Sequence, residues 1–186
     1  MQSFLIGLGI VVVLVALLYN FLVSRKNQVE NIFGSVDTLL KKRFDLIPSL
    51  VATVQEAMSH ERETLEEITA LRSRAMKPDV DPNEMAKLDS KFSSLLGSIM
   101  VALEDYPDLK ANENTMHLQR SLNEIEEQLS AARRAYNQAV TDYNNAIEMV
   151  PTNILANFLN YKRKSVFLID ESERKNPNVR ELFGRK

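Results

Sequence analysis

Few residues in this chain have a spacing that could support catalysis. His60 and Glu61 begin the zinc-protease pattern in which a second His follows four residues after the first, but Thr64 occupies that position. The other histidine, His117, falls in a different predicted helix, and the chain has no cysteine. The sequence also lacks a nucleophile elbow and a Gly-rich phosphate loop. We therefore predict a protein that is not an enzyme and that uses no metal or other cofactor.

Charged residues are interleaved in sign rather than gathered around one point. The acidic members are Glu61, Glu63, Glu66, Glu67, Glu124, Glu126 and Glu127, and the basic members are Arg62, Arg72, Arg74, Arg120, Arg133 and Arg134. Such a pattern favours a solvated, salt-bridged helix surface. The chain carries 23 basic and 25 acidic residues, a formal charge of -2, so it lacks the broad basic face that phosphate backbones require. We predict no nucleic-acid partner.

Two Tyr-Asn pairs are the main candidates for recognition. Tyr136-Asn137 and Tyr143-Asn144 stand seven residues apart and therefore share one face of a helix. One interpretation is that both tyrosines belong to the core, with hydroxyls that find partners at its edge. The other is that the pairs form a docking ridge for another subunit. Asn144 and Asn145 together place polar amides beside the core, where they would fix helix register. The further interface candidates are Phe158, Tyr161, Phe167, Leu182 and Phe183.

These residues have to be positioned by helices, and the first predicted helix is a membrane anchor. Residues 4–23 contain no charged side chain, and a helix of about 20 residues spans roughly 30 Å, the thickness of the hydrocarbon core. Residues 1–3 carry no positive side chain, which argues against a cleaved signal peptide and leaves them as a short outer terminus. Arg25 and Lys26 follow the anchor, so we expect the amino terminus outside and the remaining chain in the cytoplasm.

The composition after the anchor predicts an all-α domain over residues 24–161. Apolar residues at three- and four-residue spacing mark one stripe from Val29 to Ile68, a second helix that begins at Asp81 and ends at Tyr106, and a third from about Glu113 to Val150. Pro48 should kink or break the first helix, because proline has no amide hydrogen and clashes with the preceding turn. We expect an antiparallel up-and-down bundle of three long helices, or of four if the first is broken.

The carboxyl-terminal part leaves two alternatives open. Residues 154–164 are predicted as a short helix that is apolar up to Tyr161 and basic at Lys162, Arg163 and Lys164. An irregular tail is predicted from these basic residues onward, over residues 162–186. This helix either caps the open end of the bundle, which we favour, or lies on an anionic membrane surface. Three long passes would place it far from the membrane, unless the chain folds back at Pro48. The second helix is also shorter than the third, so the long stripes need cover from the first helix or from another chain.

Several stretches of the chain resemble the LemA family of bacterial membrane proteins. They are RFDLIPSLVATVQEAMSHERETLEEITALRSRA (Arg43 to Ala75), YPDLKAN (Tyr106 to Asn112) and ARRAYNQAVTDYNNAIEMVP (Ala132 to Pro151), followed by NILANFLNY. The resemblance implies an outer amino terminus, one membrane span and a cytoplasmic helical bundle without an established enzymatic activity or cofactor. The family resemblance also includes a relative among magnetosome proteins, and that relative is linked to membrane formation. The basic YKRKSVF stretch departs from the Gly-rich sequence expected there, which leaves any family role of the tail open.

We expect the chain to act by assembly. The favoured function is a self-assembling scaffold at the cytoplasmic face of the bacterial plasma membrane, which organises or shapes that membrane; its partners are the lipid bilayer and further copies of the chain. The alternative is a membrane-tethered adaptor that recruits an unidentified membrane or cytoplasmic protein through the bundle face or the tail.

Overall fold

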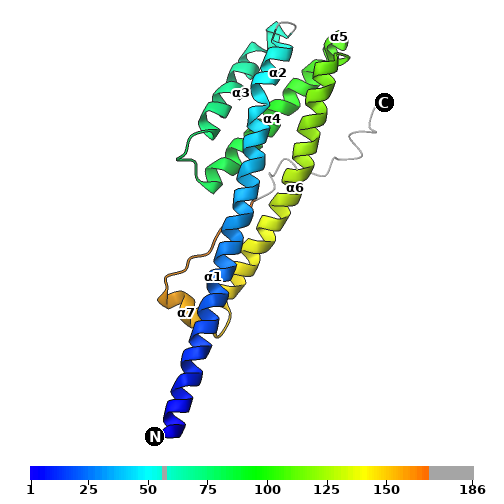
Figure 1. The fold of residues 1–186 in the computed structure, drawn as a ribbon. Helices are drawn as coiled ribbons and strands as arrows, with labels where there is room; N and C mark the ends of the chain where they lie inside the picture. The colour runs from blue at the N-terminus through cyan, green and yellow to red at the C-terminus, as the bar shows by residue number, and fades with distance from the viewer. Residues whose placement is uncertain (56–57, 168–186) are drawn as a thin grey trace, which may run out of the picture.

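The computed structural model describes residues 1–55 and 58–167, and every regular element within these ranges is a helix (Figure 1). The first helix, α1 (Gln2–Asp45), is 44 residues long, so the apolar segment 4–23 and the first part of the bundle form one continuous helix. Its length and composition would allow it to cross a membrane, and only 6% of its most apolar window is buried. We call the end of the bundle next to the apolar segment of α1 the proximal end, and the opposite end of the bundle the distal end.

The helix break that the sequence predicts near Pro48 is present. Helix α1 ends at Asp45, and α2 (Ile47–Val54) follows with Pro48 in its first turn. At the break the Leu46 amide donates to the carbonyl oxygen of Arg43 at 3.2 Å, a tightened last turn. Because the proline cannot complete the α1 ladder, the helix restarts here. The restarted helix continues toward the distal end (Figure 1).

A chain reversal that the spacing does not reveal interrupts the predicted stripe from Val29 to Ile68. The short helix η1 (Ser59–Glu61) leads into α3 (Arg62–Ala75), which runs back toward the proximal end beside α2 (Figure 1). Met58, at the reversal, is fully buried. The prediction of one stripe carried by a single long helix or by two helices in series is therefore wrong at this point. No Gly or Pro lies between Pro48 and Pro78, so the turn has no local marker.

The next turn and helix agree with the sequence. Helix α4 (Pro82–Ala102) begins at Asp81, whose carboxylate accepts hydrogen bonds from the amides of Asn83 at 2.8 Å and Glu84 at 3.0 Å. Two short helices follow, η2 (Leu103–Asp105) and α5 (Pro107–Lys110). The long α6 (Glu113–Glu148) starts at the cap residue Asn112 and has 36 residues, and α7 (Thr152–Phe158) comes after it.

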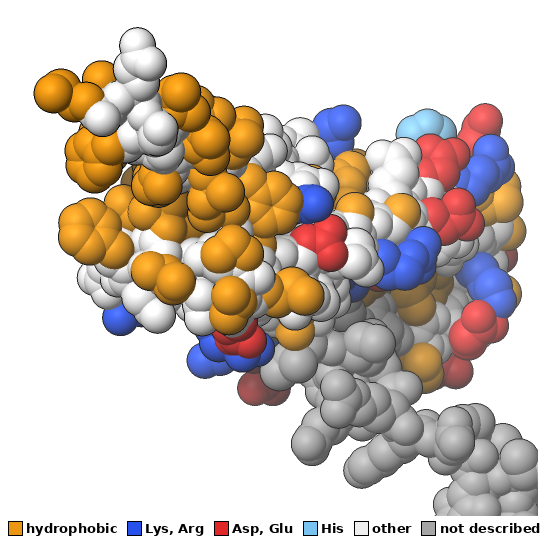
Figure 2. All heavy atoms as spheres, turned by 90° about the horizontal axis from the view of Figure 1, so that it is seen from below, with side chains coloured by type: hydrophobic (Ala, Val, Ile, Leu, Met, Phe, Trp, Pro, Cys, Tyr) orange, Lys and Arg blue, Asp and Glu red, His pale blue; other side chains and the backbone are white. Residues whose placement is uncertain are grey.

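The direction of α6 corrects the expected position of the carboxyl-terminal region. Helix α3 adds a pass, so α6 runs antiparallel to α1 and ends at the proximal end (Figure 1). An ion pair of 3.6 Å between Arg25 and Asp142 shows that the last turns of α6 lie beside the end of the apolar segment. Helix α7 therefore lies at the proximal end, contrary to the three-pass arrangement. Seen from this end, hydrophobic side chains gather around the start of α1 (Figure 2).

The core has two parts along the rod. In the proximal half α1 packs on α6, and the buried residues include Leu22, Val29, Val36 and Leu40 from α1 and Leu129, Tyr136, Val140 and Tyr143 from α6. The extended segment 161–167 lies against this pair and covers part of the stripes that would otherwise need a neighbouring chain. In the distal half α4 joins, and the rings of Phe44 and Phe92 meet edge-on at 5.5 Å. Burying one such large apolar side chain stabilises the fold by about 1.5–3 kcal/mol.

Candidate functional site

The residues considered for catalysis do not form a site in the described chain. His60 lies in η1 at the distal reversal, and His117 lies in the first turns of α6; both side chains are exposed. Among the described residues, no group of three His, Cys, Asp or Glu side chains could hold a metal ion. The notable polar features are instead a buried charge cluster and a set of contacts that bind the segment 161–167.

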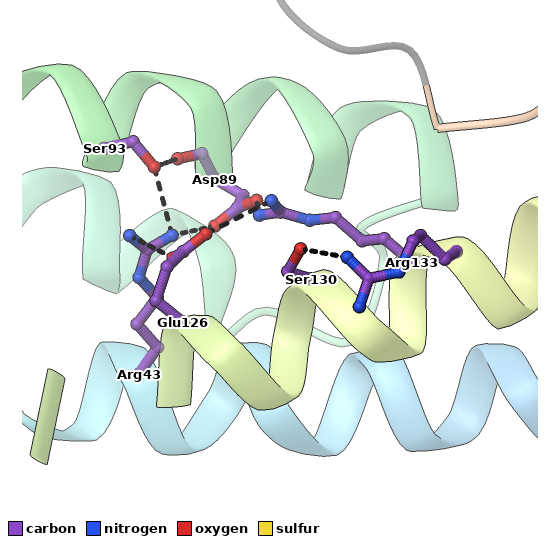
Figure 3. Close-up of polar contacts among 7 residues, drawn as sticks. Arg43, Asp89, Ser93, Glu126, Ser130 and Arg133 are labelled. Atoms are coloured by element: carbon purple, nitrogen blue, oxygen red, sulfur yellow. Dashed lines mark hydrogen bonds and ion pairs between the residues drawn. The ribbon is translucent and has the colours of Figure 1, made fainter. Parts of the chain in front are cut away.

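The charge cluster joins three helices in the distal half of the rod (Figure 3). Arg43 from α1 donates to Asp89 of α4 at 2.6 Å and lies 2.8 Å from Glu126 of α6. Arg133 of α6 contacts the other carboxylate oxygen of Asp89 and lies 3.5 Å from Glu126. Arg43 and Asp89 are each only 4% exposed. The two guanidinium groups and the two carboxylates therefore neutralise one another. This matters because a single buried charge without a partner would strongly destabilise the fold.

Further contacts orient Arg43 within this cluster. It donates to the Ser93 hydroxyl at 3.1 Å, and its guanidinium lies 4.6 Å from the centre of the Phe92 ring. Every carboxylate oxygen faces an arginine, an arrangement suited to holding α4 in register on α1 and α6 and not to moving protons. Glu126 and Arg133, which the interleaved charge pattern predicts on a solvated face, both contribute to this cluster. The available signal concerned Asp89 alone, which stands four residues after Met85 and so beside the apolar stripe of α4; nothing in the spacing indicates its arginine partners.

The two Tyr-Asn pairs bind the segment 161–167 of the same chain. The Asn144 amide donates to the carbonyl oxygen of Lys164 at 2.9 Å, and its oxygen accepts from the Lys164 amide at 3.0 Å. Asn137 makes the same two hydrogen bonds with Phe167, at 3.0 and 2.8 Å. Each Asn side chain thus takes the place of one residue of a neighbouring strand. We call these contacts the tail clamp.

The seven-residue spacing of the motif has a geometric reason. Seven residues of helix advance about 10.5 Å, and three residues of extended chain cover roughly the same distance. Asn137 and Asn144 therefore meet Phe167 and Lys164, which are three residues apart, with both in register. A one-residue change in the spacing on α6 would rotate one asparagine by about 100° and break the match.

The tyrosines of the motif complete the tail clamp. The Tyr143 hydroxyl donates to the carbonyl oxygen of Lys162 at 3.0 Å, and Tyr136 reaches the backbone of Ser165 at 3.4 Å. Ring contacts support both, Tyr136 with Phe167 at 4.9 Å and Tyr143 with Tyr161 at 6.3 Å.

Burial affects the acidity of both hydroxyls. It raises the pKa of Tyr136 above its ordinary value, because the charged phenolate would lose hydration. The pKa of Tyr143 is raised first by burial, and then by the neighbouring Tyr161 and Glu30.

The other predicted site residues lie in different surroundings. Phe158 is 86% exposed at the end of α7 and lies outside the tail clamp. Leu182 and Phe183 lie outside the described residues. The predicted topology determinants lie just beyond the apolar segment, where Arg25 pairs with Asp142 and Lys26 lies 3.9 Å from Glu30. The structure therefore brings Tyr136, Asn137, Tyr143, Asn144, Tyr161 and Phe167 into one cluster.

Comparison with known proteins gives a consistent family match. The model of the LemA family matches residues 32–180. The LemA protein of Metamycoplasma hominis is 28% identical over 163 residues, which cover 88% of this chain and 74% of that protein. Two magnetosome proteins match over 79 residues: MamQ 2 of Paramagnetospirillum magneticum at 34% identity and MamQ of Magnetospirillum gryphiswaldense at 30%. Each of these matches covers 42% of this chain and 29% of the magnetosome protein.

Proposed function

The chain belongs to the LemA family, and from this premise and its geometry we propose that it is a non-enzymatic, membrane-anchored scaffold that assembles from several copies. The anchor is the apolar segment of α1. Arg25 and Lys26 directly after it favour an orientation with the bundle at the cytoplasmic face of a bacterial plasma membrane. The magnetosome relatives support a role in organising or shaping that membrane.

The observation that carries the proposal is an exposed stripe on the face of α1 opposite α6. Its residues recur at alternating steps of four and three: Ile6, Ile10, Val13, Leu17, Asn20, Ser24, Asn27, Asn31, Gly34 and Thr38. This is the seven-residue period of helices that pack side by side at a small angle. Every member is exposed, although a second stripe with the same period, which includes Leu22, Val29 and Val36, is buried on the other face.

The composition of the exposed stripe changes where α1 would leave the membrane. Residues 6–17 of the stripe are aliphatic, whereas those from Asn20 onward are small or polar. Within lipid, helices associate through close packing and interhelical hydrogen bonds, to which Asn20 could contribute. Beyond it, asparagines at Asn27 and Asn31 would select register in a parallel pair, as buried asparagines do in coiled coils. Parallel pairing of α1 between copies therefore uses the whole stripe.

Disulfide cross-linking tests this pairing, because the natural chain has no cysteine. Asn27→Cys places a thiol on the stripe, and the matched control Gln28→Cys places one about 100° around the helix on the same turn. Both side chains are exposed. After mild oxidation in native membranes, we expect the Asn27→Cys variant to run as a covalent dimer and the Gln28→Cys variant to remain monomeric. Equal cross-linking of the two, or none in either, would contradict pairing through the stripe.

Particle mass provides an independent measurement. After gentle extraction, mass photometry and electron microscopy of the same sample should show a uniform particle of several copies. A particle with the mass of one 21.2 kDa chain plus detergent would argue against self-assembly.

The second candidate function is an adaptor, favoured by a groove at the distal end. The groove lies between α2 and α3, has a volume of about 770 Å³ and includes Val51, Met58 and Leu65 in its lining. Ala70 also lines it and is exposed, so Ala70→Arg would fill the groove without disturbing the core. An adaptor should lose a co-purifying protein in this variant and keep the cross-linking pattern of α1 unchanged. Deletion of residues 168–186 tests the tail: an adaptor that binds through the tail should lose the co-purifying protein, while the contacts of the tail clamp remain.

A further inference from the structure

The corner between α6 and α7 carries apolar side chains that the bundle does not use. Met149 and Val150 in the connection are 64% and 78% exposed, and Ile154 and Phe158 on α7 are 71% and 86% exposed. Ile154 and Phe158 stand four residues apart and so share a helix face. The opposite face of α7 is held against the bundle, with Ala156 only 1% exposed. Helix α7 thus carries apolar side chains on both faces, and the face with Ile154 and Phe158 points away from the protein.

The position of the α6–α7 corner along the axis of α1 indicates that a membrane surface would cover its apolar side chains. A groove of about 360 Å³ is lined by Phe21 and Arg25 from α1 together with Met149, Val150 and Pro151 from the corner. Phe21 lies within the apolar segment, about 3 Å along the helix axis before its end at Val23. If α1 spans a bilayer, the corner is therefore level with the boundary between the hydrocarbon and the headgroups.

Charged side chains border the corner on the side toward the bundle. The basic ones are Arg25, Lys26, Lys162, Arg163 and Lys164, and four of them pair with Glu30, Asp142 or Glu148: Arg25, Lys26, Arg163 and Lys164. Basic residues are in excess, which suits the anionic surface of a cytoplasmic leaflet. Seen from the proximal end, hydrophobic side chains form a broad patch, with Lys and Arg side chains and some Asp and Glu side chains along its edge (Figure 2).

We propose that the α6–α7 corner is a second membrane contact, in which Met149, Val150, Ile154 and Phe158 insert into the anionic interface of the leaflet that α1 leaves. This contact rests on the proposed membrane anchoring by α1. A single helix would leave the rod free to tilt and rotate, whereas two contacts set its angle and its rotation about α1. The exposed stripe of α1 would then face along the membrane, the direction in which further copies could add.

Fluorescence quenching by brominated lipids tests the insertion, because the natural chain has no tryptophan. Three full-length single-tryptophan variants are reconstituted in vesicles of phosphatidylglycerol and brominated phosphatidylcholine. Phe158→Trp reports on the corner, Tyr19→Trp reports on the anchor, and Val101→Trp is a matched control on α4, where Val101 is 73% exposed. We expect Phe158→Trp to be blue-shifted and quenched to an extent close to that of Tyr19→Trp, and Val101→Trp to be unaffected.

The outcomes separate this inference from the anchoring on which it rests. Quenching of Tyr19→Trp without quenching of Phe158→Trp would overturn the second contact and leave the anchor intact. A blue-shifted but unquenched Phe158→Trp would also overturn it, because protein and not lipid would then cover the corner. Absence of quenching in all three variants would instead refute the anchoring. Replacing phosphatidylglycerol with a zwitterionic lipid should weaken the quenching of Phe158→Trp alone; equal quenching would refute the role of the basic border.

Discussion

The charge cluster offers the sharpest test of how the three helices are held together. Asp89 is 4% exposed and accepts from two arginines, of which Arg43 is equally buried. Replacing Asp89 with Ala would leave Arg43 with Glu126, a carboxylate whose side chain is 44% exposed, as its remaining ion-pair partner in the described cluster. Removing one member of a buried ion pair costs about 3–5 kcal/mol, because the other charge stays buried without full compensation.

The remaining Glu126 contact places the expected loss for Asp89→Ala near the lower end, about 3 kcal/mol. For a chain of this length, 1 kcal/mol corresponds to about 2–4 °C, so the melting temperature should fall by about 6–12 °C. The assay is thermal unfolding of the full chain in detergent micelles, followed by circular dichroism of the helical signal. Glu67→Ala is the control, since it breaks an exposed pair with Lys91 between α3 and α4 and should cost at most about 1 kcal/mol.

A double variant separates the cost of the unpaired charge from the value of the pair itself. Arg43→Met combined with Asp89→Leu replaces the pair with apolar side chains of similar size. Such a replacement is often neutral or stabilising, so the double variant should melt well above Asp89→Ala. Two results would contradict a costly unpaired charge at Arg43: a melting temperature of Asp89→Ala as high as that of Glu67→Ala, or a double variant that is as unstable as Asp89→Ala.

Three further predictions concern the tail clamp and the core. Asn144→Ala removes two hydrogen bonds and should lower the free energy of unfolding by about 1–3 kcal/mol. Backbone amides of segment 161–167 should then exchange hydrogen faster, while those of α6 should not. Unchanged protection of segment 161–167 would contradict the tail clamp. Burial raises the pKa of Tyr136 and Tyr143 in the folded chain above the ordinary value of 10.0, so the hydroxyls of the unfolded chain lose their protons at a lower pH. The free energy of unfolding should therefore be at its full value below pH 10.0 and should fall as the pH rises through the folded pKa. Urea denaturation from about pH 9 to 11 checks this, and a double Tyr→Phe variant at these positions should lose less stability over that range. Phe44→Ala should cost about 3–5 kcal/mol in the same assay, since Phe44 is fully buried against another ring; a loss below about 1 kcal/mol would contradict the packing.

Local signals in the sequence were sufficient for most of the helices. The break near Pro48 follows from the missing amide hydrogen, and the start of α4 follows from Asp81 and the proline after it. The long α6 follows from an uninterrupted apolar period, and its observed bounds, Glu113–Glu148, differ from the predicted ones by only two residues at the end. In each case the decisive interactions lie within one turn or one stripe of the same helix.

The charge cluster and the tail clamp needed contacts between distant residues. Arg43 and Asp89 are 46 residues apart, and neither has a sequence neighbour that predicts the pairing. The Tyr-Asn motif was recognisable as a site of contact, but its partner was not, because segment 161–167 has no periodic pattern of its own. Its role depends on the match between seven helical residues and three extended ones, which appears only when the two segments lie side by side.

By itself, the sequence determined the helical class, the apolar segment of α1 and the stripes along which the helices pack. The tertiary structure decided the number of helical passes and therefore the end of the bundle at which α6 ends and α7 lies. The sequence between α2 and α3 contains no Gly or Pro, and Val54 and Met58 keep a helical spacing there, so local propensity cannot distinguish a turn from a continuing helix. Packing α3 against α2 and α4 supplies the free energy that favours the turn. One added pass then moves α7 from the distal end to the proximal end, beside the apolar segment.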